Sequence, residues 1–187
     1  MSRPDQHDPG TLLRGWWSQY TATSDDDMLS TQDRLAVTAP FGQRWPGLAP
    51  RPEDRAGPEA TADQLGSDLL IDHPTMRLGL IAAERGADAL TAAGWSGPAN
   101  YTNDTAEISA VLRSWEDRFG VRVVLAGHAT LYLSVAAPPT TPSEALQVAA
   151  EHFAFCPDNI WQGTKPYTLA AYAKRLIGEH SWAFGWD

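Results

Sequence analysis

Two short runs rich in β-branched residues, residues 121–126 and 130–136, constrain the fold of this 187-residue chain most strongly. They flank a Gly127-His128 turn. Apolar residues occupy every second position, with Val121, Val123 and Leu125 on one face of the first run and Leu131, Leu133 and Val135 on one face of the second. This period of two, interrupted by a glycine-containing turn, predicts a β-hairpin. The apolar face of such a hairpin has to be covered by packed helices or by another sheet.

Helical patterns lie on both sides of the hairpin. Before it, Asp104 can cap a helix whose apolar residues recur at helical spacing as far as Phe119. After it, Thr141-Pro142-Ser143-Glu144 combines an N-cap, an N-terminal proline and a glutamate that can complete a capping box. Pro157 should end this helix at Cys156. Further helices are predicted over residues 59–71, 87–93 and 167–176.

Two other segments are predicted to be strands. Aromatic residues alternate with small ones over residues 181–187, and Leu78–Ala82 is an apolar run of strand length. The resulting order predicts an α+β fold, in which helices pack on one face of a mainly antiparallel sheet. A ferredoxin-like βαββαβ arrangement with an inserted helix has a compatible order.

The first part of the chain lacks such clear periodicity. Prolines and glycine interrupt residues 1–30, and five prolines lie between residues 40 and 58. Only residues 12–17 are expected to dock, as a short amphipathic turn, and residues 35–37 are expected to form a short strand. The sequence therefore predicts an irregular N-terminal arm and Pro-rich covering segment over residues 1–58, and an α+β globular domain over residues 59–187.

The chain is acidic, with a formal net charge of −9. Such a charge repels a phosphate backbone and attracts a basic surface, so nucleic-acid binding is not expected whereas a basic protein partner is. Residues 1–5 lack the apolar region of a signal peptide, and no apolar run has the length needed to span a bilayer. We therefore expect a cytoplasmic, soluble protein without membrane contact.

The stretch Glu151–Asp158 gathers the groups that are chemically most versatile. His152 and Cys156 are four residues apart, so they would share one helix face if the last turn stayed helical. An imidazole beside a thiol is the minimal pairing for an activated nucleophile, and Asp158 or Glu151 could orient the imidazole. Against this, the C-terminus of a helix disfavours a thiolate, and a lone cysteine often fills space in the core.

Other candidate residues surround this stretch in the sequence. His152, Cys156, Asp158 and His180 could supply the three or four ligands of a metal site, although the spacing is a weak signal. A role in binding a ligand or partner is predicted for Glu151, His180, Trp182 and Trp186. The two tryptophans share one face of the last predicted strand, where core packing competes with this role. A single cysteine excludes a disulfide framework and a cysteine-cluster metal site. No nucleotide-binding or HExxH motif occurs, so no cofactor is predicted.

The chain resembles a bacterial family of uncharacterised proteins, number 4253 in the domain-of-unknown-function series. The matching segments are Gly94–Gly97 with Asn100, Trp115–Gly120, Glu151–Asp158 and Trp182–Asp187. A weaker similarity occurs at Pro40–Gly42 and Trp45–Gly47. The family usually has an aromatic residue where this chain has Gly185. Because the family has no assigned chemistry, the resemblance implies membership without a mechanism.

The leading functional prediction is a small acidic protein that binds a partner through an acidic face with aromatic anchors. Analogy with immunity proteins of similar size and acidity favours an immunity-type or accessory role. The alternatives are a small hydrolase or transferase that uses Cys156 and His152, and a metal- or small-ligand-binding module at the same place. The oligomeric state, the partner and the substrate are left open by the sequence.

Overall fold

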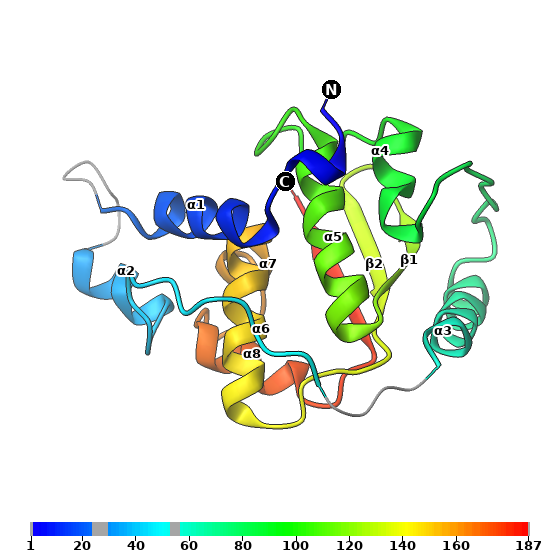
Figure 1. Cartoon of the computed structure of the whole chain (residues 1–187). Helices are drawn as coiled ribbons and strands as arrows, with labels where there is room; N and C mark the ends of the chain where they lie inside the picture. The colour runs from blue at the N-terminus through cyan, green and yellow to red at the C-terminus, as the bar shows by residue number, and fades with distance from the viewer. Residues whose placement is uncertain (1, 24–29, 53–56, 187) are drawn as a thin grey trace. The chain divides into compact units, whose positions relative to one another are not determined.

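The computed structural model describes residues 2–23, 30–52 and 57–186 and has the predicted α+β class (Figure 1). The chain divides into two compact units. The sheet unit comprises residues 1–9, 51–138 and 179–187, and the helical unit comprises residues 10–50 and 139–178. The chain therefore passes between the two units four times. The predicted division into a covering segment of residues 1–58 and a domain of residues 59–187 stays a prediction.

The sheet has three antiparallel strands in the order β1 (Arg122–Ala126), β2 (Thr130–Ser134) and β3 (Ser181–Gly185). The predicted hairpin and C-terminal strand are thus confirmed. A β-bulge shifts the register of β1 between Val123 and Leu125. Leu131 and Leu133 of β2 lie opposite Phe184 and Trp182 of β3, so these four buried side chains share one face.

Helix α5 (Thr105–Phe119) covers that apolar face (Figure 1). The side chain of Asp104 accepts a hydrogen bond from the backbone N–H of Ala106, which caps the helix as predicted. Gly120 ends it in the left-handed conformation, with a φ of 62° that suits glycine. Along the helix, Trp115 stacks on Phe184 at 5.5 Å between ring centroids. The main core of the sheet unit therefore lies between α5 and the sheet.

Helix α3 (Pro58–Asp72) contacts β1 and β2 from the opposite side of the sheet. Glu59 at its start forms an ion pair of 2.9 Å with Arg122 of β1. Arg122 lies opposite Ser134 in the register, on the face away from the Leu133 side chain. The prediction placed helices on one face only, and α3 departs from it. The sheet unit also contains the helical turns η1 (Pro4–Gln6) and η2 (Gly86–Asp88) and the short helix α4 (Ala89–Ala93).

The helical unit is built around helix α6 (Pro142–Phe155), which packs against α8 (Leu169–Leu176). Thr141 and Glu144 form the predicted capping box at its start. Phe153 of α6 makes edge-to-face contacts with Trp17, Tyr20 and Trp161. These rings come from α1 (Pro9–Thr21) and from the short helix α7 (Asp158–Trp161), so aromatic packing holds the unit together.

Three predictions about local structure are wrong. Residues 9–21 form helix α1, whose Leu13 and Trp17 side chains are buried, where an irregular arm with one docked turn was expected. Residues 35–37 belong to helix α2 (Thr31–Val37), because the Ser30 hydroxyl accepts the N–H of Asp33 and caps a helix there.

The third error concerns Leu78–Ala82, which do not form a strand. This run contains only one β-branched residue and has a glycine in its interior, and both features weaken strand pairing. The described residues consequently form a three-stranded sheet, without the fourth strand of the ferredoxin-like arrangement. Within the same described ranges, no helix combines the length and apolar character needed to cross a membrane.

Candidate functional site

The predicted cluster of His152 and Cys156 lies where α6 ends, in the helical unit. Cys156 is the C-cap residue, with φ −150° and ψ 87°, and its N–H still donates to the His152 carbonyl at 2.8 Å. Pro157 disfavours helical geometry at the preceding residue, which explains why the chain leaves the helix there. Cys156 therefore lies outside the helical conformation, so the last turn does not continue as a helix and the shared helix face that depended on it is not formed.

A chain of hydrogen bonds, buried at His152 and partly buried at Asn159, joins these two side chains. The Cys156 thiol donates to the amide oxygen of Asn159 at 3.6 Å, and the Asn159 amide donates to the Tyr172 hydroxyl at 3.0 Å. That hydroxyl lies 2.9 Å from Nδ1 of His152. His152 and Cys156 are fully buried, and burial raises the pKa of Tyr172 well above its usual value. The network thus connects the C-terminal end of α6 with Tyr172 of α8.

The two carboxylates of the stretch also face the interior. Glu151 is fully buried, and its Oε1 accepts the backbone N–H of Ala49 at 2.7 Å, which holds the segment before residue 50 against α6. Asp158 is the first residue of α7. Burial, with smaller contributions from Cys156 and Asp158, raises the pKa of Tyr20 to about 12. The carboxylates of Glu151 and Asp158 are therefore both buried in the helical unit.

This geometry favours a structural role for the cluster. A cysteine nucleophile needs access to substrate and a stabilised thiolate, whereas the Cys156 side chain is fully buried at the C-terminal end of a helix. Among the residues that the structure describes, no three His, Cys, Asp or Glu side chains are arranged to hold a metal ion. What the arrangement does provide is hydrogen bonding that joins α6, α7 and α8.

The burial of Cys156 leads to a direct prediction. In the folded protein, iodoacetamide at neutral pH should alkylate Cys156 at least about tenfold more slowly than a model thiol, because only opened molecules expose the sulfur. Intact-mass spectrometry measures the rate, and the same protein in concentrated urea is the positive control. Labelling in the native state faster than the model thiol would instead support the predicted enzyme.

The other predicted site residues belong to the sheet unit. The Trp182 ring packs edge-on against Trp115 and Phe119, each at 5.5 Å between centroids, and Trp186 packs against Trp95 at 5.6 Å. Both side chains are at most 2% exposed. Both tryptophans therefore pack in the core, which the sequence analysis gave as the alternative to a binding role. The predicted site residues are therefore distributed over two units, and their direct participation in binding remains an untested prediction.

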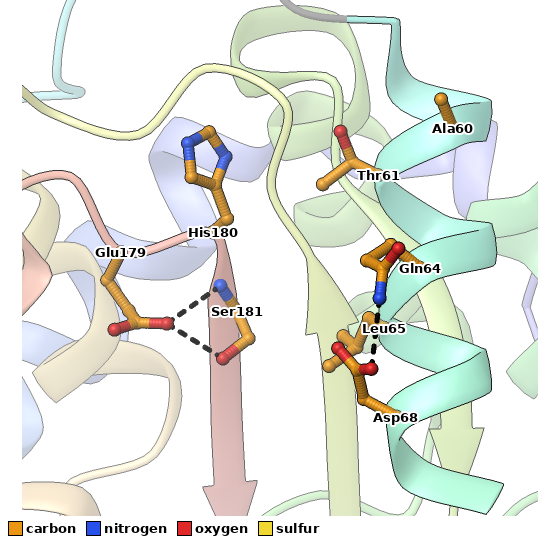
Figure 2. Close-up of a pocket in the computed structure, with 8 residues that line it drawn as sticks. All are labelled: Ala60, Thr61, Gln64, Leu65, Asp68, Glu179, His180 and Ser181. Carbon is orange, nitrogen blue, oxygen red and sulfur yellow. Dashed lines mark hydrogen bonds between the residues drawn. The ribbon is translucent and has the colours of Figure 1, made fainter.

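His180 lines a pocket that the sequence analysis missed. The pocket has a volume of about 520 Å³ and lies between α3 and the residues that begin β3 (Figure 2). Its lining residues are Ala60, Thr61, Gln64, Leu65, Asp68, Glu179, His180 and Ser181. The four-residue spacing of Ala60, Gln64 and Asp68 indicates one helix face, but the sequence does not show which strand lies opposite it.

A second feature missed by the sequence analysis is a group of exposed apolar residues at the end of α3 and in the segment after it. Leu70 and Ile71 at the end of α3 are 56% and 77% exposed. Leu78 and Leu80 are 91% and 92% exposed, and Ile81 is 48% exposed. We call these five residues the apolar segment. The Leu78–Ala82 run was predicted to be a strand because it is apolar and of strand length. Exposed apolar side chains that lie close together are typical of interaction sites, so the exposure of this run is notable.

Comparison with known proteins agrees with the resemblance noted in the sequence. A family model described as Domain of unknown function (DUF4253) matches residues 77–187, which is more than half of the chain. The matched range includes the extended residues 78–82, the sheet with α5, and helices α6 to α8. No curated protein and no solved structure matches significantly. The chain therefore belongs to the DUF4253 family.

Proposed function

We propose that this protein acts by binding a partner protein whose contact surface is both apolar and basic. The observation that carries the proposal is the apolar segment, in which Leu78 and Leu80 are almost completely exposed. Large apolar side chains exposed close together along a chain are typical of interaction sites, because water disfavours them until a partner covers them. The apolar segment would supply the hydrophobic centre of such a contact.

The charge of α3 supports a basic partner. This helix carries Glu59, Asp63, Asp68 and Asp72 and no lysine or arginine, within a chain of net charge −9. Its C-terminal end contributes Leu70 and Ile71 to the apolar segment. A surface that combines carboxylates with exposed leucines is complementary to one that combines lysine or arginine with apolar residues. The same charge disfavours nucleic acid as the partner.

Binding of this kind would act by occlusion, since a small acidic protein covers the basic surface on which its partner depends. An immunity-type or accessory role in the cytoplasm, as expected from the sequence, belongs to the same proposal. Trp182 and Trp186 are buried, so we assign the anchoring contacts to Leu78 and Leu80 rather than to indole rings. This assignment makes the proposal testable by mutation without disturbing the core.

The double variant Leu78→Ser/Leu80→Ser tests the proposal. Each leucine contributes about 1.5–3 kcal/mol when it becomes fully buried, so the double variant should bind the partner at least about a hundredfold more weakly. The tagged wild-type protein is used to isolate candidate partners from the source cells. A candidate that is purified separately is then titrated with both proteins by calorimetry.

The matched control is Ile177→Ser, which removes an apolar side chain that is 39% exposed in the helical unit. The control should bind as the wild type does, and raising the salt concentration should weaken binding of both. Equal affinity of the double variant and the wild type for every partner would refute the proposed surface. Self-association that the double variant abolishes, detected by light scattering, would identify a second copy as the occupant and contradict the basic partner.

A further inference from the structure

The pocket beside α3 has two walls of different origin. Figure 2 shows Gln64 and Asp68 on α3 and Glu179, His180 and Ser181 at the start of β3, with the Glu179 carboxylate on the side of β3 away from α3 in this view. The volume of about 520 Å³ lies within the range of about 300–1,000 Å³ that is typical of small-molecule sites. The pocket can therefore hold one complete side chain together with its adjoining backbone.

Hydrogen-bond acceptors are present on both walls. Asp68 accepts from the Gln64 amide at 2.9 Å, and Glu179 accepts from the N–H and the hydroxyl of Ser181 at 3.2 and 2.9 Å. Within the described ranges, neither carboxylate has a lysine, arginine or histidine within ion-pair distance. Two carboxylates without an internal cation make the pocket a favourable place for a positive charge.

His180 contributes an imidazole ring to the lining of the pocket. Its Nδ1 lies 2.7 Å from the Val135 carbonyl oxygen, which can only accept, so Nδ1 is the ring nitrogen that carries the hydrogen. In the neutral ring, Nε2 is then an acceptor. The hydrogen bond also fixes the ring, since Val135 directly follows β2 and the His180 carbonyl in turn accepts the Val135 N–H at 2.8 Å. The pocket lining thus includes an imidazole whose ring is held in place by this hydrogen bond.

An independent observation comes from the sheet beside the pocket. Ser134 is fully buried, and its hydroxyl has no hydrogen-bond partner in the described part of the chain. It lies directly opposite Ser181 in the register of β2 and β3, so both side chains point to the same side of the sheet. Buried hydroxyl groups in native proteins are normally paired with protein, water or ligand. This unpaired hydroxyl lies beside the lining residue Ser181, although Ser134 itself does not line the pocket.

We propose that this pocket binds an arginine side chain of the basic partner. A guanidinium group presents five N–H donors in a planar fork, which suits acceptors that lie on two walls, whereas an ammonium group is a compact point charge. The methylene stem of arginine would pack on Ala60 and Leu65, which are the apolar part of the lining. The inference depends on the proposed function only for the partner that carries the arginine, because the pocket itself can be tested with a small probe.

The probe is N-acetyl-arginine amide, titrated into the full-length protein and followed by the backbone amide signals in NMR spectra. We expect saturable shifts at Gln64, Ser181 and their neighbours. The matching citrulline compound has the same shape without the charge, and it should bind at least about tenfold more weakly. The lysine compound should also bind more weakly than the arginine compound, because it lacks the planar fork.

Variants separate the pocket from general charge attraction. Asp68→Asn and Glu179→Gln each remove one carboxylate charge and should weaken binding of the arginine probe roughly tenfold. Asp63→Asn removes the same charge from an exposed position of α3 that does not line the pocket, and it should leave the affinity unchanged. Circular dichroism checks that each variant keeps the fold.

Two results would overturn the inference. One is the absence of saturable shifts at the pocket with the arginine probe, and the other is equal weakening by Asp63→Asn and Asp68→Asn. Either result leaves the proposed function intact if Leu78→Ser/Leu80→Ser still loses the partner. Conversely, specific binding of the arginine probe together with full partner binding by that double variant would refute the proposed surface while supporting the pocket.

Discussion

Replacing Trp182 by alanine is expected to lower the free energy of unfolding by about 3–5 kcal/mol, the range found when a large core aromatic is truncated. The side chain is 1% exposed, and its ring, on the second residue of β3, contacts Trp115 and Phe119 of α5. Its removal leaves a cavity between the sheet and the helix that covers it. Urea unfolding followed by far-UV circular dichroism measures the loss, which is a large part of the total for a small protein.

The matched control lies next to it on the same strand. Ala183 points to the opposite face of β3 and is exposed, so Ala183→Ser should change the stability by less than about 0.5 kcal/mol. If Trp182→Ala proved no more destabilising than this control, the packing of α5 on β3 described above would be incorrect. The experiment therefore tests the core of the sheet unit without relying on any function.

Replacing Phe153 by alanine is expected to have a similar effect in the helical unit, also about 3–5 kcal/mol. Phe153 is 1% exposed and makes edge-to-face contacts with Trp17 and Tyr20 of α1 and with Trp161 of α7. Each such pair adds about 0.5–1.5 kcal/mol beyond burial of the area. The same urea titration measures the loss, and limited proteolysis detects release of α1.

Cleavage within α1 should become faster in Phe153→Ala, because the helix loses the ring on which it docks. Ser143→Ala, an exposed change in the first turn of the same helix α6, is the control and should leave both the stability and the proteolysis pattern nearly unchanged. Unaltered protection of α1 in Phe153→Ala would show that the N-terminal helix does not depend on this aromatic contact, contrary to the structure.

Much of the local structure could be predicted because its causes are close together in the sequence. The capping box of Thr141 and Glu144 joins groups three residues apart, and the Asp104 cap acts over two residues. The hairpin follows from alternation on both sides of a short turn, and Pro157 acts on its immediate neighbour. In these places, backbone hydrogen bonds and short-range steric effects decide the conformation before any tertiary contact forms.

The errors occur where burial was decided at long range. Helix α1 is amphipathic, but its docking depends on Phe153, more than 130 residues away. The apolar run Leu78–Ala82 was expected to form a strand, whereas no strand of the described residues pairs with it and its leucines are exposed. An apolar pattern by itself shows that a surface needs cover and does not show what covers it.

The candidate sites illustrate the same division. The sequence by itself determined the α+β class, the family, the acidic charge and the end of α6 at Cys156. Only the tertiary structure placed His152 and Cys156 in a buried network with Tyr172, and brought Asp68 of α3 to the same pocket as Glu179. The physical reason is that caps, turns and periodicity act between neighbours, whereas solvent exposure and charge pairing depend on which distant segments pack together.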